Sequence, residues 1–187
     1  MTNKFSHYLK SKKKLIRLLI DQLGVKYPYV SVLGTDTSGS SITVDKSTAN
    51  VSPSGLTESG FVIKVFNGKA YSELSTNEIT KKNIPVLLAE IDRLAAFKGE
   101  IPLVDVKALK EEKVTRRFVR KNKGKTYSTA DIIDLLKGYV TKTLSASKLA
   151  VNVIASVEIS EVSKMFMSKN KDLEQYYTWA NPRCYVL

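Results

Sequence analysis

The stretch Gly60-Phe-Val-Ile-Lys-Val-Phe-Asn-Gly-Lys-Ala-Tyr-Ser-Glu-Leu-Ser-Thr-Asn-Glu-Ile79 contains two short β-runs joined at Asn67-Gly68, and this arrangement is the most informative feature of the chain. Asn-Gly readily adopts the positive φ angles that a tight hairpin turn requires. The two runs must therefore pair antiparallel. The polar segment Ser75-Thr76-Asn77 follows the second run and leads toward a helix.

The segment before this hairpin predicts a helix and a second hairpin. A helix is expected over residues 8–23, where apolar residues recur at three- and four-residue spacing at Leu9, Ile16, Leu19, Ile20 and Leu23. Two runs with period two follow, at 29–33 and 41–45, and the Ser/Gly-rich segment 35–40 between them predicts a turn. The first half is therefore a helix followed by about four strands.

Helices are predicted next. One is expected over residues 84–98, with Pro85 confined to its first turn, where a missing N–H breaks no hydrogen bond. Another begins at Ser128-Thr-Ala-Asp131, which has the spacing of a capping box. Residues 99–126 between them are charge-rich and weakly periodic, so we expect a basic, mobile connection with at most a short strand at 114–119.

The last third predicts three more strands. Residues 149–159 alternate apolar and polar residues, Ser160-Glu161 is expected to turn this run into 162–168, and a final strand covers 176–187. This strand stops at Cys-Tyr-Val-Leu187 as though the polypeptide continued. The expected class is α+β, antiparallel β-hairpins packed with about three helices in the order α-β-β-β-β-α-α-β-β-β. We expect a single domain over residues 1–187.

Composition restricts the function classes. The net charge is +12; residues 1–26 carry seven Lys/Arg and one acid, and residues 98–125 carry ten and four, so each segment contributes +6. Such local excess predicts two basic patches rather than a uniformly basic surface. No apolar run is long enough to span a bilayer, and the amino terminus lacks the apolar core of a secretory signal, so we expect a cytoplasmic protein that does not contact membranes.

The opening motif resembles the amino-terminal domain of the TldD/PmbA family, zinc peptidases also called modulators of DNA gyrase. The residues that carry this resemblance are Gly60, Lys64, Asn67, Gly68, Ser75, Thr76, Asn77, Ser168 and Asn170. Lys64 stands where the family usually has arginine, and Asn170 replaces a glycine. Asn tolerates a left-handed backbone better than other residues except glycine, so the replacement of that glycine by Asn170 is physically reasonable.

Zinc is not expected to bind to this chain. The resemblance implies that the family's zinc ligands, two histidines and a glutamate on a helix plus a distant cysteine, belong to a carboxy-terminal half that this sequence does not contain. His7 is the only histidine, whereas a hydrolytic zinc site needs about three protein ligands. We therefore expect no catalytic residues, no cofactor, and no peptidase activity from the chain alone. His7 is expected on the surface, and Cys184 as a buried, inert thiol.

The resemblance implies a binding function. In the family, such a domain helps to form a homo- or heterodimer with a TldD/PmbA-like protein and encloses the cavity through which unfolded peptide reaches zinc. An exposed edge strand can pair with an extended peptide. Tyr176, Tyr177 and Trp179 on the last predicted strand are the candidate peptide-contact residues.

The alternative is a free-standing basic module that binds nucleic acid or another polyanion. Lys/Arg residues cluster between 113 and 125, and Phe118 among them is able to stack on a base. The candidate contacts are Arg116, Arg117, Arg120 and Lys121. No sequence signature of a nucleic-acid-binding fold accompanies the cluster, and a solvated loop is the favoured explanation of it.

Overall fold

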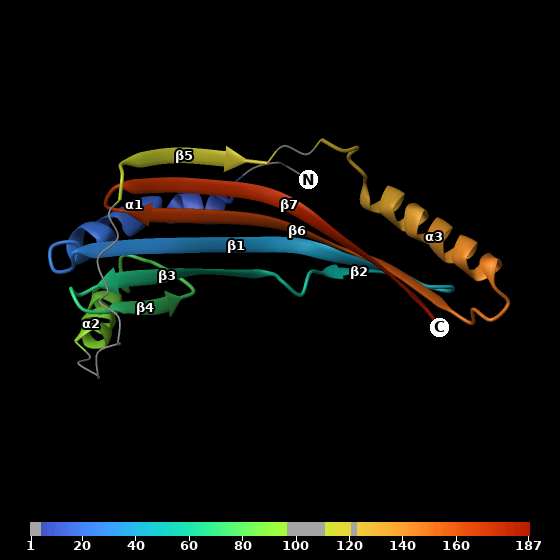
Figure 1. Cartoon of the computed structure of the whole chain (residues 1–187), viewed down its shortest axis with the longest axis horizontal. Coiled ribbons are helices and arrows are strands. Elements are labelled where there is room, and N and C mark those ends of the chain that lie inside the picture. The colour runs from blue at the N-terminus through green and yellow to red at the C-terminus, as the bar shows by residue number, and fades with distance from the viewer. Residues whose placement is uncertain (1–4, 97–110, 121–122) are drawn as a thin grey trace. The chain divides into compact units, whose positions relative to one another are not determined.

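The computed structural model describes residues 5–96, 111–120 and 123–187. Figure 1 shows the elements in chain order: α1 (His7–Leu23), β1 (Tyr29–Val44), β2 (Ala49–Pro53), β3 (Glu58–Phe66), β4 (Tyr71–Thr76), α2 (Ile84–Ala95), β5 (Val114–Val119), α3 (Thr129–Ala146), β6 (Val153–Ser168) and β7 (Lys171–Val186). The expected α+β class, with three helices and a mostly antiparallel sheet, is confirmed.

The central hairpin forms where Asn67-Gly68 predicts it. Strands β3 and β4 pair antiparallel from Phe61 opposite Thr76 to Phe66 opposite Tyr71. Gly68 has a φ of 94°, the only positive φ among the described residues. The Asn67 side-chain oxygen accepts hydrogen bonds from the backbone N–H groups of Lys69 and Ala70, both at 2.9 Å. The side-chain amide and the glycine thus fix this turn together.

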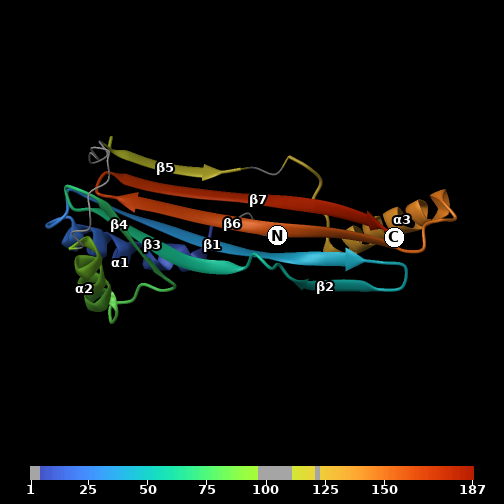
Figure 2. The ribbon, with the colours of Figure 1, turned by 60° about the horizontal axis from the view of Figure 1, so that its bottom comes forward.

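The strands follow the order β4-β3-β1-β6-β7-β5, with β2 paired to β1. Strand β5 pairs with β7 in parallel, residues 114–119 against 171–176, and Figure 2 shows the two side by side. Its presence confirms the short strand expected at 114–119. The rest of the expected connection 99–126 lies partly outside the described residues.

Two predicted turns are wrong, because both segments lie inside continuous strands. Residues 35–40 belong to β1, and Ser160-Glu161 belongs to β6. Gly34 and Gly39 are needed for close approach rather than for reversal. A Cβ at Gly34 would lie 2.9 Å from side-chain atoms of Leu9 and Phe61, and one at Gly39 only 2.0 Å from the backbone oxygen of Ile159. Glycine inside a strand often marks such a site.

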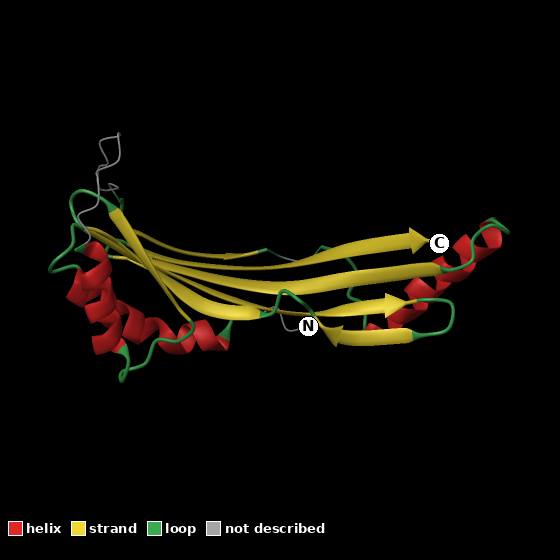
Figure 3. Ribbon diagram, turned by 90° about the horizontal axis from the view of Figure 1, so that it is seen from below, coloured by secondary structure: helices red, strands yellow, loops and turns green. Residues whose placement is uncertain are grey.

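The first of two compact units comprises residues 1–36, 58–119 and 163–176. Its core joins α1 and α2 to one face of the strands, and all five predicted apolar residues of α1 are buried in it. Val30 and Val32 of β1 and Met165 and Met167 of β6 face these helices. Figure 3 shows both helices on the same side of the strands. The opposite side of this unit carries neither α1 nor α2, and we call it the outer face.

The second unit comprises residues 37–57, 120–162 and 177–187. Its core joins Leu136 and Val140 of α3 to alternate residues of β6, from Val153 to Ile159, and to Ile42 and Val44 of β1. Helix α3 begins with the predicted capping box, in which the side chains of Ser128 and Asp131 each accept a hydrogen bond from the other's backbone N–H. None of the described helices is long and apolar enough to span a membrane.

Candidate functional site

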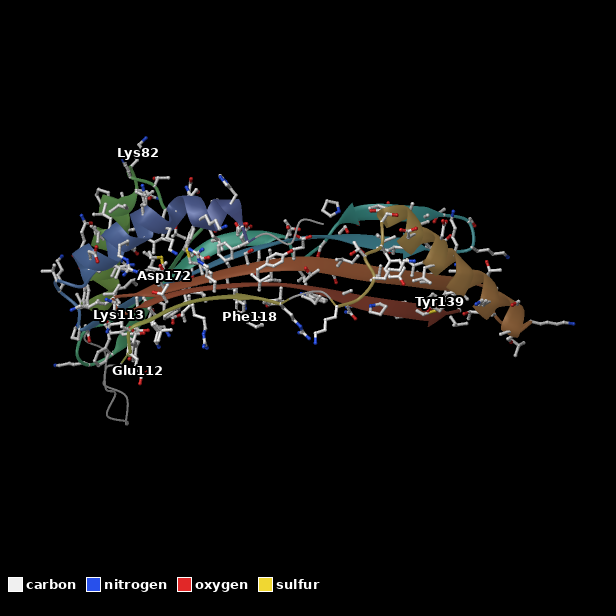
Figure 4. The ribbon with its side chains drawn as sticks, turned by 90° about the horizontal axis from the view of Figure 1, so that it is seen from above. Lys82, Glu112, Lys113, Phe118, Tyr139 and Asp172 are labelled. Carbon is white, nitrogen blue, oxygen red and sulfur yellow. The ribbon has the colours of Figure 1, made fainter. Side chains whose placement is uncertain are left out.

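The outer face of the first unit contains a small pocket beside strand β5. It has a volume of about 270 Å³, and its apolar lining comes from four strands, with Leu33 on β1, Phe118 on β5, Phe166 on β6 and Leu173 on β7. Figure 4 labels Phe118 on β5, on the side away from helix α1. Because strand side chains alternate between faces, these residues point away from the buried methionines of β6. We call this cavity the β5 pocket.

Two cations, Arg116 and Lys164, border the β5 pocket. Among the described residues, no carboxylate forms an ion pair with either of them. Glu174 also lines the pocket, but its carboxylate pairs with Lys13 at 2.8 Å and with Arg117 at 3.1 Å. The pocket therefore combines an apolar floor with two positive charges that the described chain does not neutralise.

An ion-pair cluster lies on the helix side of the same strands. Lys13 of α1 is 2.8 Å from carboxylate oxygens of both Asp172 and Glu174, and the Glu174 side chain is only 6% exposed. Burial acts to lower the pKa of Lys13, but hydrogen bonds to the two carboxylates outweigh it, and the pKa is raised. This cluster joins α1 to β7, and through Arg117 it also holds β5.

The first group of motif residues supports the hairpin. Lys64 pairs with Glu73 across the two strands at 2.6 Å, and its ammonium lies over the ring of Tyr71. A Cβ at Gly60 would lie 3.2 Å from the backbone oxygen of Thr76, so the two strands are close there. The Thr76 hydroxyl donates to the backbone oxygen of Glu78. In this chain, Lys64, Gly60 and Thr76 therefore make contacts that stabilise the hairpin and the turn after it.

The motif residues around Ser168 organise the turn between β6 and β7. Ser168 is fully buried, and its hydroxyl donates to Glu111 and accepts from the backbone N–H groups of Asn170 and Lys171. The Asn170 side-chain amide donates to the backbone oxygen of Glu111. Asn170 does not adopt the left-handed backbone that would suit a glycine, because no described residue other than glycine has a positive φ. Asn170 is used for its side-chain hydrogen bond instead.

The structure does not bring the three candidate peptide-contact residues together on one face. Tyr176 is only 2% exposed, whereas Tyr177 and Trp179 are half-buried. Tyr176 alternates with the other two along β7, so its ring points to the opposite face. Peptide contact by Tyr177 and Trp179 stays a prediction, while the burial of Tyr176 leaves little of its ring for a ligand.

The candidate polyanion contacts are also divided. Arg116 borders the β5 pocket, whereas the neighbouring Arg117 pairs with Glu174. Arg120 is exposed after the end of β5, and Lys121 lies outside the described residues. Adjacent strand residues point to opposite faces, so Arg116 and Arg117 do not form one patch.

The described residues do not fit a zinc site. No group of three or more His, Cys, Asp or Glu side chains is gathered in the described part of the chain. His7 is exposed on the first turn of α1, as predicted. The prediction of a buried Cys184 is wrong, because the residue is exposed. It lies in the last part of β7, where exposed residues follow one another from Pro182 to Leu187 and no core covers the strand.

The fold and the site define an α+β protein with a pocket on one sheet face and no metal-ligand cluster in its described part. No protein-family model matches the sequence, and no curated protein matches it. Solved structures do match. A putative modulator of DNA gyrase from Bacteroides thetaiotaomicron aligns with a TM-score of 0.71 at 17% identity, over 94% of this chain and 41% of that protein.

Two further structures agree with this comparison. A putative modulator of DNA gyrase from Thermotoga maritima aligns with a TM-score of 0.58 at 15% identity, over 95% of this chain and 41% of that one. TldE from Thermococcus kodakarensis aligns with a TM-score of 0.54 at 12% identity, over 92% of this chain and 38% of that one. The resemblance to TldD/PmbA proteins is thus confirmed at the level of the fold. The chain spans about two fifths of the length of these structures.

The sequence reasoning missed the β5 pocket. Its residues come from four strands that are distant in sequence, and only pairing brings them together. One local signal was available: Lys164 and Phe166 alternate with the buried Met165 and Met167, so β6 has a second, half-buried face. The missed cluster of Lys13, Asp172 and Glu174 likewise depends on contacts between distant segments.

Proposed function

We propose that this chain is a non-catalytic, TldD/PmbA-type amino-terminal domain that acts in the cytoplasm. It contributes to a dimer with a TldD/PmbA-like protein and to the cavity that admits unfolded peptide. The observation that carries this proposal is the alignment over 94% of this chain but only 41% of the Bacteroides protein, with a TM-score of 0.71. Peptide chemistry would then belong to the zinc-bearing part of a TldD/PmbA-like protein.

The side chains support a binding function. The described residues contain no group of three side chains that could hold a metal ion. They do contain an apolar pocket with two cations whose charges no described carboxylate pairs. Concave apolar surfaces with a few placed polar groups are typical of binding sites.

Sedimentation equilibrium tests the proposed association. We expect the purified chain to sediment above its 20.8 kDa monomer mass, either alone at increasing concentration or after mixing with a full-length TldD/PmbA-type protein. Binding between copies or partners is concentration-dependent, so a concentration series separates dimer from monomer. A monomer mass at every concentration, with no complex in the mixture, would contradict the proposal.

The nucleic-acid alternative has weaker support. Continuous phosphate binding requires several cations along one track. Arg117 is paired with Glu174, and Arg116 lies on the other face of β5. Arg116 and Lys164 still leave two unpaired charges among the described residues, so an oligonucleotide belongs among the ligands tested below.

A further inference from the structure

We propose that the β5 pocket binds an extended peptide in which an acidic residue stands two positions from an apolar one. This inference deepens the proposed function, and it rests on that function for the choice of a peptide. The apolar side chain would enter between Leu33, Phe166 and Leu173, and the carboxylate two positions away would meet Arg116 or Lys164.

The floor of the pocket, which consists of Leu33, Phe118, Phe166 and Leu173, favours an apolar group of the ligand. Leu33 is 38% exposed and Phe118 is 51% exposed, and Phe166 and Leu173 are half-buried. A side chain placed over them would remove apolar surface from water on both partners, which is the main favourable term in association. The cavity of about 270 Å³ suits one or two side chains rather than a folded element.

The rim of the pocket, which we define as Arg116 and Lys164, favours a carboxylate. Arg116 and Lys164 stand on β5 and β6, and no described acidic side chain pairs with either. Glu174, the acidic residue among those that line the pocket, pairs with Lys13 and Arg117. A guanidinium can hold a carboxylate through two parallel hydrogen bonds, and proximity to apolar surface strengthens such a pair. A basic peptide would meet repulsion at the same place.

A peptide suits this geometry better than a nucleic acid. The same segment that lines the pocket is an edge strand, because β5 ends the strand order beside β7. In an extended peptide, residues two positions apart point to the same side, so an apolar residue and an acidic residue with one residue between them reach the floor and the rim together. Nucleic acid requires a longer row of cations, and Arg117 is unavailable because it pairs with Glu174.

Fluorescence anisotropy with the full 187-residue chain tests this inference. The probe is a labelled, unstructured peptide that repeats Leu-Ser-Asp-Ser, so that Leu and Asp are two positions apart. Matched peptides replace Asp by Lys or Leu by Ser, and a labelled oligo-dT represents nucleic acid. The variant Arg116→Gln/Lys164→Gln removes both rim charges, and Phe118→Ser reduces the apolar lining.

The control is Lys81→Gln/Lys82→Gln, which removes the same net charge at two exposed residues that do not line the pocket. We expect the Leu-Asp peptide to bind the rim variant about tenfold more weakly than the parent, because two charge-assisted contacts are lost. The control variant should bind the peptide as tightly as the parent does. Phe118→Ser, whose side chain is half exposed, should also weaken binding while the melting temperature stays close to that of the parent.

Equal binding of the Leu-Lys peptide, or unchanged binding to the rim variant, would overturn the inference. Tighter binding of oligo-dT that the rim variant abolishes would assign the pocket to nucleic acid instead. The two proposals fail separately. If the chain binds the Leu-Asp peptide selectively but forms no complex in sedimentation equilibrium, only the proposed dimer is rejected. If it forms a complex but does not distinguish the peptides, only the proposed ligand of the β5 pocket is rejected.

Discussion

Gly39→Ala is expected to lower the free energy of unfolding by about 3 kcal/mol, since adding a methyl group to a packed site forces the backbone to move. A Cβ at this position would lie 2.0 Å from the backbone oxygen of Ile159 and 3.0 Å from the Cα of Ser160. Both contacts are to backbone atoms of β6, so no side-chain rotation relieves them. The strands β1 and β6 must separate locally. Urea unfolding followed by circular dichroism measures the change.

Gly138→Ala in the same unit is the matched control. Nothing lies within 4 Å of a Cβ built at Gly138, which is inside helix α3. Alanine has a higher helix propensity than glycine, so this substitution should raise the free energy of unfolding by up to about 1 kcal/mol. The two substitutions are chemically identical and should have opposite signs. A neutral or stabilising Gly39→Ala would show that β1 and β6 do not approach as described.

Lys13→Met is expected to destabilise the first unit by about 1–3 kcal/mol, because it leaves buried carboxylate charge with one partner fewer. The Glu174 side chain is 6% exposed, and Arg117, whose own side chain is 70% exposed, would be its one remaining ion-pair partner among the described residues. Lys14→Met is the control, since Lys14 is exposed on the same helix. It should change stability by less than about 0.5 kcal/mol.

The effect of Lys13 should depend on pH. Its pKa is raised above the unfolded value of 10.5 in the folded chain. A raised pKa means that the folded state favours the charged lysine, so its contribution is fully present below that unfolded value and is lost as pH rises through the folded pKa. The difference in melting temperature between parent and Lys13→Met should therefore be constant from pH 7 to pH 9 and shrink at higher pH. A difference that grew with alkalinity would contradict this assignment.

Local signals in the sequence predicted local structure well. The Asn67-Gly68 turn, the apolar stripe of α1 and the capping box of α3 each depend on residues within a few positions of one another, and each is confirmed. Such features need no knowledge of distant segments. They were enough to predict the class and the resemblance of the fold to TldD/PmbA proteins.

The wrong predictions involve distant segments. From the sequence, Gly39 resembles a turn residue. The structure shows that glycine is needed there because the backbone of Ile159 leaves no room for a Cβ. Asn170 resembles a left-handed substitute for glycine until Glu111 is seen to accept its amide hydrogen bond. The β5 pocket requires four strands in register before its residues meet. In each case strand pairing, rather than local preference, decides the role of the residue.

We propose that this chain binds peptide without cleaving it. The decisive experiment is a time course of fluorescence anisotropy with the labelled Leu-Asp peptide, the purified 187-residue chain and added zinc. We predict that anisotropy rises on mixing and then stays constant, because the peptide is held intact. Anisotropy that decays below its bound value as short labelled fragments are released, or that never rises, would contradict the account.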